Sequence, residues 1–261
     1  MPHISLQMYT LREFMTTPGQ VDETLRRVAE IGYRYVQPSV PAFLSAKDFK
    51  ALLDRHGLRA DSFSFLSPDM AGGLDQILAT AQTLETSCVR AGAIPMAESY
   101  TKEGFERYAA KINPDGRLLR SHGLTYIYHF HAYEFVDLGG IRGIDILLRQ
   151  TDPDAIHFQP DVHWMAAAGE EPSATLDQFK GRAEYIHMQG YAILPDPREK
   201  RPVARCTVPV GQGNLNWPGI VAAARRIGIE MYVVEQDDCY IDAFESVRQS
   251  FEALRALGIE P

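Results

Sequence analysis

Short runs rich in β-forming residues alternate with longer amphipathic stretches along the whole chain, and this alternation restricts the fold more than any other feature. The pattern repeats eight times, which predicts parallel βα units. At four boundaries a glycine stands just before the next strand, at Gly32, Gly57, Gly123 and Gly228, as expected where a helix ends in an αβ loop. The repeat predicts an α/β protein in which residues 1–261 form one (β/α)8 TIM barrel as a single domain.

The expected strands and helices follow from the alternation of β-rich runs and amphipathic stretches. The predicted strands are Ile4–Met8, Tyr33–Gln37, Leu58–Ser64, Cys88–Ala93, Leu124–His129, Ile156–Asp161, Glu184–Met188 and Met231–Glu235. The predicted helices are Val21–Ile31, Ala46–Arg55, Asp75–Leu84, Lys102–Ser121, Ile144–Gln150, Thr175–Phe179, Trp217–Ile227 and Ala243–Leu257. The residues Asn113-Pro114-Asp115-Gly116 are typical of a turn and predict a kink that divides the fourth helix in two. The longest expected loop, Gly190–Asn216, follows the seventh strand and is expected at the active-site face.

Composition and charge exclude several classes of protein. The formal net charge of −8 and the pI near 5.5 argue against broad binding of nucleic acid and favour small molecules as partners. The three cysteines are too few and too scattered for a disulfide framework or a CxxC metal site. The chain shows no signal-peptide pattern and no apolar run of the roughly 18 residues that a membrane span needs, so we expect no membrane partner and a cytoplasmic location. Exposed barrel helices often pair, so a homo-oligomer is compatible with the sequence.

Ionisable residues stand at the ends of four successive strands of the predicted barrel: His129, Asp161, His187 and Glu235. Barrel strands are buried on both faces, so such residues need a hydrogen-bond partner or a ligand. Because neighbouring strands lie only about 4.8 Å apart, the four side chains are expected to converge on one divalent cation. Imidazole mixed with carboxylate suits Mn²⁺ best, with Co²⁺, Zn²⁺, Ni²⁺, Fe²⁺ or Mg²⁺ as alternatives.

Further polar and aromatic residues lie near the same strand ends. His131 shares the strand parity of His129, so either histidine can be the ligand while the other is a base. The residues expected to contact a substrate are Gln7, Gln37, Glu134, His163, Trp164, Gln189 and Arg205.

At these residues the chain resembles the xylose isomerase-like superfamily of TIM barrels, which includes sugar phosphate isomerases/epimerases and AP endonuclease 2-type barrels such as endonuclease IV. The resemblance rests on Leu6-Gln7-Met8-Tyr9-Thr10-Leu11-Arg12, Tyr128-His129-Phe130-His131 with Glu134-Phe135, Asp161-Val162-His163-Trp164, Ile186-His187-Met188, Val210-Gly211-Gln212-Gly213-Asn214 with Asn216-Trp217-Pro218, and Val234-Glu235-Gln236-Asp237. It covers essentially the whole chain and implies a metal held by Glu, Asp, His and Glu. The last three roles match Asp161, His187 and Glu235, and His129 stands where the first Glu is expected.

The resemblance implies a sugar or keto-sugar as substrate and removal of a proton α to a carbonyl by Glu235, His129 or His131. Reprotonation then gives isomerisation or epimerisation, which we favour, whereas loss of a β-leaving group gives a lyase or dehydratase acting on a keto-sugar, keto-inositol or keto-glycoside. An endonuclease IV-like phosphodiesterase and a non-catalytic barrel are less favoured alternatives. The sequence departs from the related subgroup at Phe130, Gln159-Pro160 and Gln189-Gly190, which leaves the identity of the substrate open.

Overall fold

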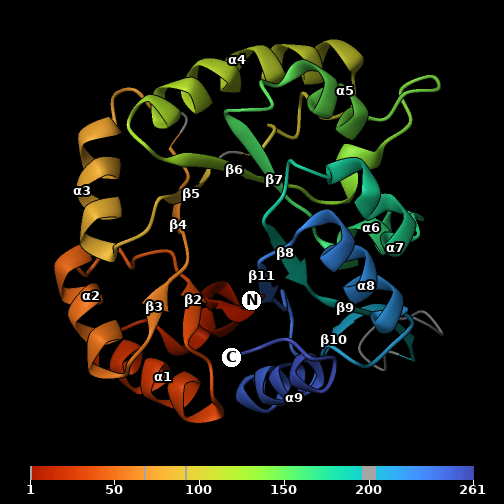
Figure 1. Cartoon of the computed structure of the whole chain (residues 1–261). Coiled ribbons are helices and arrows are strands. Elements are labelled where there is room, and N and C mark those ends of the chain that lie inside the picture. Colours follow the sequence, from red (N-terminus) through yellow and green to blue (C-terminus); the bar gives the residue numbers. More distant parts are fainter. Residues whose placement is uncertain (1, 68, 92, 196–203) are drawn as a thin grey trace.

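A ring of parallel strands forms the centre of the computed structural model, which describes residues 2–67, 69–91, 93–195 and 204–261. The barrel strands are β1 (His3–Gln7), β2 (Tyr35–Gln37), β3 (Arg59–Ala60), β4 (Phe63–Phe65), β5 (Cys88–Ala91), β6 (Thr125–His129), β7 (Ile156–Gln159), β8 (Tyr185–Met188) and β11 (Met231–Val234). The α-helices are α1 (Pro18–Ile31), α2 (Ala46–Arg55), α3 (Leu74–Leu84), α4 (Lys102–Ser121), α5 (Gly143–Gln150), α6 (Val162–Ala167), α7 (Pro172–Thr175), α8 (Trp217–Ile227) and α9 (Ala243–Ala256). Figure 1 shows the helices arranged around the strands, so the predicted TIM barrel is confirmed.

Two sheets close the barrel, in the orders β3-β2-β1-β11-β8 and β4-β5-β6-β7. A parallel bridge between Asp161 and His187 joins β7 to β8. On the other side the predicted strand Leu58–Ser64 is divided into β3 and β4. Its backbone still follows β2, because Asp61 N donates to Val36 O and Ser64 N donates to Pro38 O. The third strand therefore passes from one sheet to the other and completes the ring.

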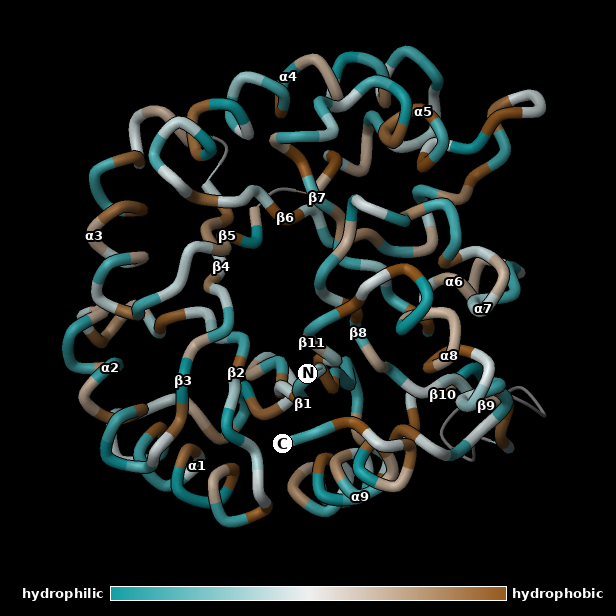
Figure 2. The backbone as a smooth tube through the Cα atoms, in the orientation of Figure 1, coloured by the Kyte–Doolittle hydropathy of each residue, from teal (hydrophilic) through white to brown (hydrophobic). Residues whose placement is uncertain are grey.

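The outer helices form because one face of each is apolar and packs on the strands. In α1 the Thr17 side chain accepts a hydrogen bond from Gln20 N and caps the helix, and the inward residues Val21, Leu25 and Val28 are fully buried. Figure 2 shows the resulting alternation of hydrophobic and hydrophilic segments along these helices. Burial of these apolar faces stabilises the barrel and positions the strand ends.

The division of the fourth helix predicted at Asn113-Pro114-Asp115-Gly116 is wrong, because α4 runs as one helix through Pro114. The Asn113 side chain donates to Gln150 O at 2.8 Å and accepts from Asp152 N at 2.7 Å, which ties the helix to the segment that follows α5. Gly116 allows close approach to β7, since an added Cβ would lie 2.4 Å from Ile156 Cδ1. These residues therefore serve helix packing, although their local composition is typical of a turn.

The segment predicted as the longest loop, Gly190–Asn216, contains an antiparallel hairpin of β9 (Gly190–Leu194) and β10 (Ala204–Val208). The predicted strand Ile156–Asp161 also ends earlier, at Gln159, because Asp161 is the N-cap of α6. His163 and Trp164 consequently lie in a short helix that the sequence pattern did not predict.

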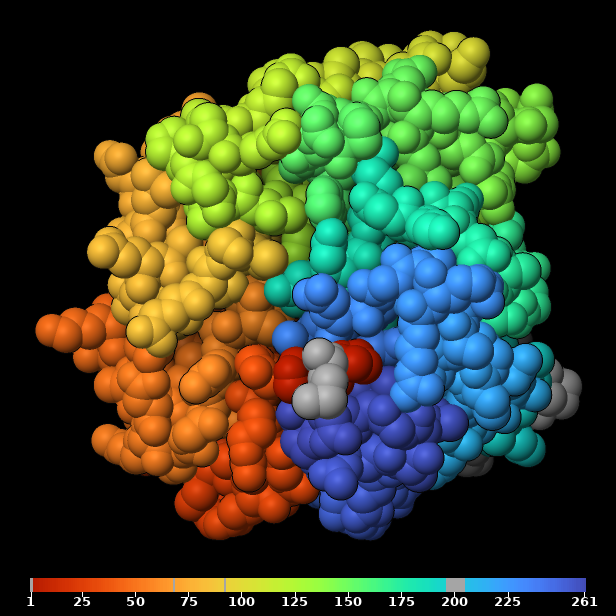
Figure 3. Space-filling model, in the orientation of Figure 1, coloured from red at the N-terminus to blue at the C-terminus, as the bar shows by residue number. Residues whose placement is uncertain are grey.

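The two chain ends meet at the end of the barrel where the strands begin. His3 forms a parallel bridge with Glu260, and Ile4 N donates a hydrogen bond to Glu260 O. Figure 3 shows the N-terminal residues beside the C-terminal segment at the middle of this face. The strand ends that carry the candidate residues thus lie at the opposite face. Within the described residues, no helix has both the length and the apolar character needed to cross a bilayer.

Replacement of Gly116 tests whether α4 and β7 require this close approach. We expect Gly116→Ala to lower the free energy of unfolding by about 1–3 kcal/mol, because the new methyl group overlaps Ile156. The control is Gly19→Ala in α1, where nothing lies within 4 Å and the change is expected to be neutral or stabilising. Urea denaturation of the two variants measures the difference, and equal stability would contradict the packing role of Gly116.

Candidate metal centre

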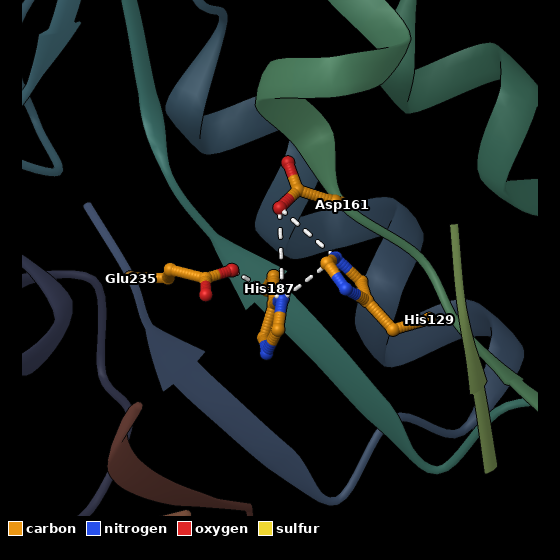
Figure 4. A group of neighbouring side chains, drawn as sticks. All are labelled: His129, Asp161, His187 and Glu235. Carbon is orange, nitrogen blue, oxygen red and sulfur yellow. Dashed lines mark hydrogen bonds and ion pairs between the residues drawn. The ribbon is translucent and has the colours of Figure 1, made fainter. Parts of the chain in front are cut away.

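Four side chains converge where neighbouring strands end (Figure 4). His129 is the last residue of β6 and His187 lies in β8, whereas Asp161 follows β7 and Glu235 follows β11. Each residue offers one nitrogen or oxygen atom, and these atoms all lie within 4.8 Å of one another. Because all barrel strands are parallel, their carboxyl ends meet at one rim and bring together residues that are far apart in the sequence.

The donor atoms of this group surround His187. Its Nδ1 lies 2.6 Å from Glu235 Oε2, 3.0 Å from His129 Nε2 and 3.6 Å from Asp161 Oδ2. His129 Nε2 is also 3.5 Å from Asp161 Oδ2. Asp161 and His187 are fully buried, and His129 is the most exposed of the four at 9%. The atoms therefore face one small volume that is largely shielded from water.

Unsatisfied carboxylate oxygens indicate that this volume fits a cation. Asp161 Oδ1 accepts hydrogen bonds from the backbone N–H groups of His163 and Trp164, at 2.8 and 3.1 Å. Asp161 Oδ2 and Glu235 Oε2 are buried, and neither receives a hydrogen bond of normal geometry from the described residues. Buried carboxylate oxygens without donors are costly, and a divalent ion would satisfy both. Two imidazoles and two carboxylates form a donor set that such ions accept.

The charges of the group shift the pKa values of all four residues. Burial alone would lower the pKa of His187, but the negative charges of Glu235 and Asp161 outweigh it and raise that pKa to about 9. Burial would raise the pKa of Glu235, yet the charge of His187 lowers it to about 2. Against burial, the nearby rings of His129 and His187 hold the pKa of Asp161 below its ordinary value. Burial and the charge of His187 lower the pKa of His129 to about 3. The metal-free group therefore carries one titratable proton at neutral pH, on His187.

A chain of hydrogen bonds beneath the group orients the His187 ring. His187 Nε2 donates to Gln37 Oε1 at 2.8 Å, Gln37 Nε2 donates to Ser62 Oγ at 2.9 Å, and Ser62 Oγ donates to Asp61 Oδ1 at 2.8 Å. Each hydrogen bond in this series is donated in the direction of the Asp61 carboxyl group. His187 therefore carries a proton on Nε2 and directs Nδ1 toward Asp161 and Glu235, the arrangement that metal-binding histidines require.

The predicted substrate contacts Gln7 and Gln37 lie in this buried layer. Both side chains are 0% exposed. Gln37 Oε1 also accepts hydrogen bonds from Gln7 Nε2 at 2.8 Å and from Gln159 Nε2 at 3.2 Å. In this structure the amides fill the barrel interior beneath His187, and their contact with substrate hydroxyls stays a prediction.

Glu134 is likewise enclosed, and its contact with substrate stays a prediction. It is 0% exposed, and its two oxygens accept hydrogen bonds from Tyr128 OH at 2.5 Å and from His131 N at 2.9 Å. Burial raises the pKa of Glu134 to about 8. We infer that Glu134 holds the backbone of the segment that carries His131.

The remaining predicted contacts lie beside the group. Gln189 is buried, and its Nε2 donates to Asp237 Oδ2 at 3.0 Å. His163, Trp164 and Arg205 line a pocket of about 180 Å³, which they share with Asp237. The structure thus places three of these four residues on a cavity next to the candidate metal centre.

A second pocket of about 310 Å³ contains the candidate catalytic residues. His129, His131 and Glu235 line it together with Arg90 and Asp237. Arg90 and Asp237 were not among the predicted site residues. Arg90 is a charged residue within the strand Cys88–Ala91, and this position was a usable signal in the sequence. The prediction considered only the strand ends and therefore did not include Arg90. Burial raises the pKa of Asp237 to about 7.

A family model described as a xylose isomerase-like TIM barrel matches residues 25–257. The chain belongs to this family. The match confirms the resemblance drawn from the sequence motifs, and it covers every barrel strand from β2 to β11.

Three relatives illustrate the range of proteins that this chain is similar to. An inosose dehydratase from Lacticaseibacillus casei is 25% identical over 158 residues, which cover 56% of this chain and 52% of that protein, so the match spans about half the length of the curated relative. A sugar phosphate isomerase/epimerase from Parabacteroides distasonis has a TM-score of 0.77 at 23% identity, with 98% of this chain and 94% of that chain covered. A xylose isomerase-like TIM barrel protein from Mycobacterium smegmatis, solved with magnesium, has a TM-score of 0.69 at 16% identity, with 98% and 96% covered. The two structures share the barrel fold.

Metal affinity is expected to depend on pH through His187. Below its pKa of about 9, His187 retains a proton on Nδ1, and a metal that binds Nδ1 displaces that proton. The other three groups are already unprotonated at neutral pH. The apparent dissociation constant for Mn²⁺ should therefore fall about tenfold per pH unit between pH 6 and 8. Calorimetric titration of the metal-free protein measures this slope, and affinity independent of pH would contradict it.

Substitution of Gln37 tests the orientation of His187. We expect Gln37→Met to weaken Mn²⁺ binding about 10- to 100-fold, the usual effect of losing a partner of a metal-binding histidine. Gln37→Glu keeps the acceptor and should retain most of the affinity. The control is Gln159→Met, which removes another hydrogen bond to Gln37 Oε1 but leaves the bond to His187. Equal loss of affinity in Gln37→Met and Gln159→Met would indicate general damage to the barrel interior.

Proposed function

We propose that the chain is a divalent-metal-dependent isomerase or epimerase of keto-sugars that removes a proton α to a carbonyl. One observation carries this proposal: Glu235 and His131 reach the same 310 Å³ pocket from different walls, from the end of β11 and from the segment after β6, beside the metal donors. A base and a second proton-transfer group on one bound substrate are what enolisation requires.

The charge states of the two residues suit their roles. In the metal-free protein the charge of His187 overcomes the effect of burial and lowers the pKa of Glu235 to about 2. A bound divalent ion would replace that positive charge and keep Glu235 ionised, so that its carboxylate can accept the α-proton. Burial lowers the pKa of His131, so its imidazole is neutral and can move a proton between the hydroxyl and carbonyl oxygens. In isomerisation Glu235 returns its proton to the neighbouring carbon, which restores both residues. The bound divalent ion would stabilise negative charge on the substrate oxygens.

Dehydration is a second candidate because Asp237 lines the same pocket. Burial and the charge of Glu235 raise the pKa of Asp237 to about 7, so a large fraction is protonated at neutral pH. Glu235 would take the α-proton, the β C–O bond would break as the C=C bond forms, and Asp237 would protonate the leaving hydroxyl to give water. The similarity to inosose dehydratases supports this alternative.

Incubation of the Mn²⁺-loaded protein with keto-sugars and keto-inositols in D₂O distinguishes the two reactions. We expect deuterium to enter the substrate at the α-carbon without loss of water. Dehydration instead yields a product lighter by one water, which mass spectrometry detects. Absence of both α-exchange and elimination, in a protein that retains its metal, would contradict the proposed function.

Substitution of His131 tests its catalytic role separately from metal binding. We expect His131→Asn to lower α-exchange or turnover by about 10²- to 10⁴-fold while Mn²⁺ affinity is unchanged, because His131 is not one of the four converging donors. The control is His122→Asn at the exposed end of α4, which should change neither quantity. Loss of metal from the His131→Asn protein would instead place His131 in the metal centre.

A further inference from the structure

Arg90 faces the candidate pocket from the wall opposite Glu235 on the barrel ring. It lies in β5, in register with Ser64 of β4 and with Ile127 of β6. His129 is two residues beyond Ile127, so Arg90 and His129 lie on the same face of the sheet. Both residues line the 310 Å³ pocket. The strand pattern therefore aims a permanent positive charge at the space beside the metal donors.

The guanidinium of Arg90 is poorly satisfied by the protein. Its Nε and Nη2 both donate to a single hydroxyl, Ser64 Oγ, at 3.2 and 2.5 Å. Nη1 has no acceptor, and no carboxylate forms an ion pair with Arg90 among the described residues. Arg182 shows the contrast, since its three nitrogens donate to two backbone carbonyls and to Thr151 Oγ1. Arg182 is thus bound into the structure, whereas the free edge of Arg90 is left for another partner.

The charged residues around the pocket leave Arg90 without an ion-pair partner. A divalent ion at the candidate metal centre would be balanced by the carboxylates of Asp161 and Glu235. Asp237 lies beyond Glu235 at the β11 side, where its carboxyl group accepts a hydrogen bond from Gln189. The pocket residues Tyr9, Ser39, Leu66 and Ala93 are uncharged. The carboxylates of Glu235 and Asp61 act on Arg90 only through space, since neither forms an ion pair with it among the described residues. A partly buried cation without a directly paired anion is costly.

We propose that Arg90 binds an anionic group of the substrate, a carboxylate or a phosphate, so that the substrate is an acidic sugar derivative. Carboxylate and phosphate share the paired oxygens that a guanidinium edge recognises. A pocket of about 310 Å³ holds one small unit with the anion at Arg90 and the reacting carbons toward Glu235. The inference rests on the proposed function for the reaction, but the anion preference is a property of binding alone.

Binding of three compounds with the same carbon skeleton to the Mn²⁺-loaded protein tests this preference. The probes are D-gluconate, D-glucose 6-phosphate and the uncharged D-glucitol, measured by calorimetry. We expect at least one anionic probe to bind about tenfold or more tightly than D-glucitol, as for a hydrogen bond to a charged group. The stronger of the two anions identifies the source of the charge. The inference is wrong if neither anion binds better than D-glucitol. It is also wrong if none of the three probes binds measurably.

Variants show whether Arg90 causes the preference. Arg90→Met should abolish it, and Arg90→Lys should retain part of it. Arg107→Met is the matched control, because it removes the same charge from an exposed ion pair with Glu98 on the protein surface. An anion preference that survives in Arg90→Met would show that the Mn²⁺ ion or another residue binds the anion. Since binding needs no turnover, a protein that prefers anions but exchanges no α-hydrogen supports this inference and contradicts the proposed function.

Discussion

The structure depends on the convergence of two buried carboxylates and two imidazoles at one end of a closed parallel barrel. Isolated, Asp161 and Glu235 would repel each other in a site with little water. The charge of His187, and a divalent ion when bound, makes their burial tolerable. Closure of the ring through the Asp161–His187 bridge brings these groups within reach of one another. Fold and site are therefore one arrangement, since the bridge that completes the barrel also joins two of the candidate ligands.

A layer of amides beneath the candidate metal centre gives the site its orientation. Gln7, Gln37 and Gln159 meet at one carbonyl oxygen, that of Gln37, which also accepts from His187. Such a polar interior is tolerated only when nearly every donor has an acceptor. The hydrogen bonds that satisfy these amides also determine which nitrogen of His187 faces Asp161 and Glu235. Stability of the barrel interior and chemistry at its rim are thus coupled through the side chain of Gln37.

Several elements could be predicted because their causes are local. Apolar spacing along α1 and the run of β-forming residues in β8 are properties of short segments, and both appear near their predicted bounds. The continuous α4 and the β9–β10 hairpin could not be predicted in the same way. Pro114 and Gly116 favour a turn locally, but packing against Ile156 and the hydrogen bonds of Asn113 keep the helix continuous. Contacts between distant segments outweighed the local preference.

For the candidate site, the sequence alone determined the order of strands and the residue types at their ends, since both follow from periodicity and composition. It therefore predicted His129, Asp161, His187 and Glu235 as a group. Only the tertiary structure decided what each atom faces: Asp161 uses one oxygen to cap α6, Glu134 turns away to Tyr128, and Arg90 points into the pocket. The physical reason is that a side chain's direction beyond a strand end depends on the backbone that follows, and that backbone is positioned by contacts with distant segments.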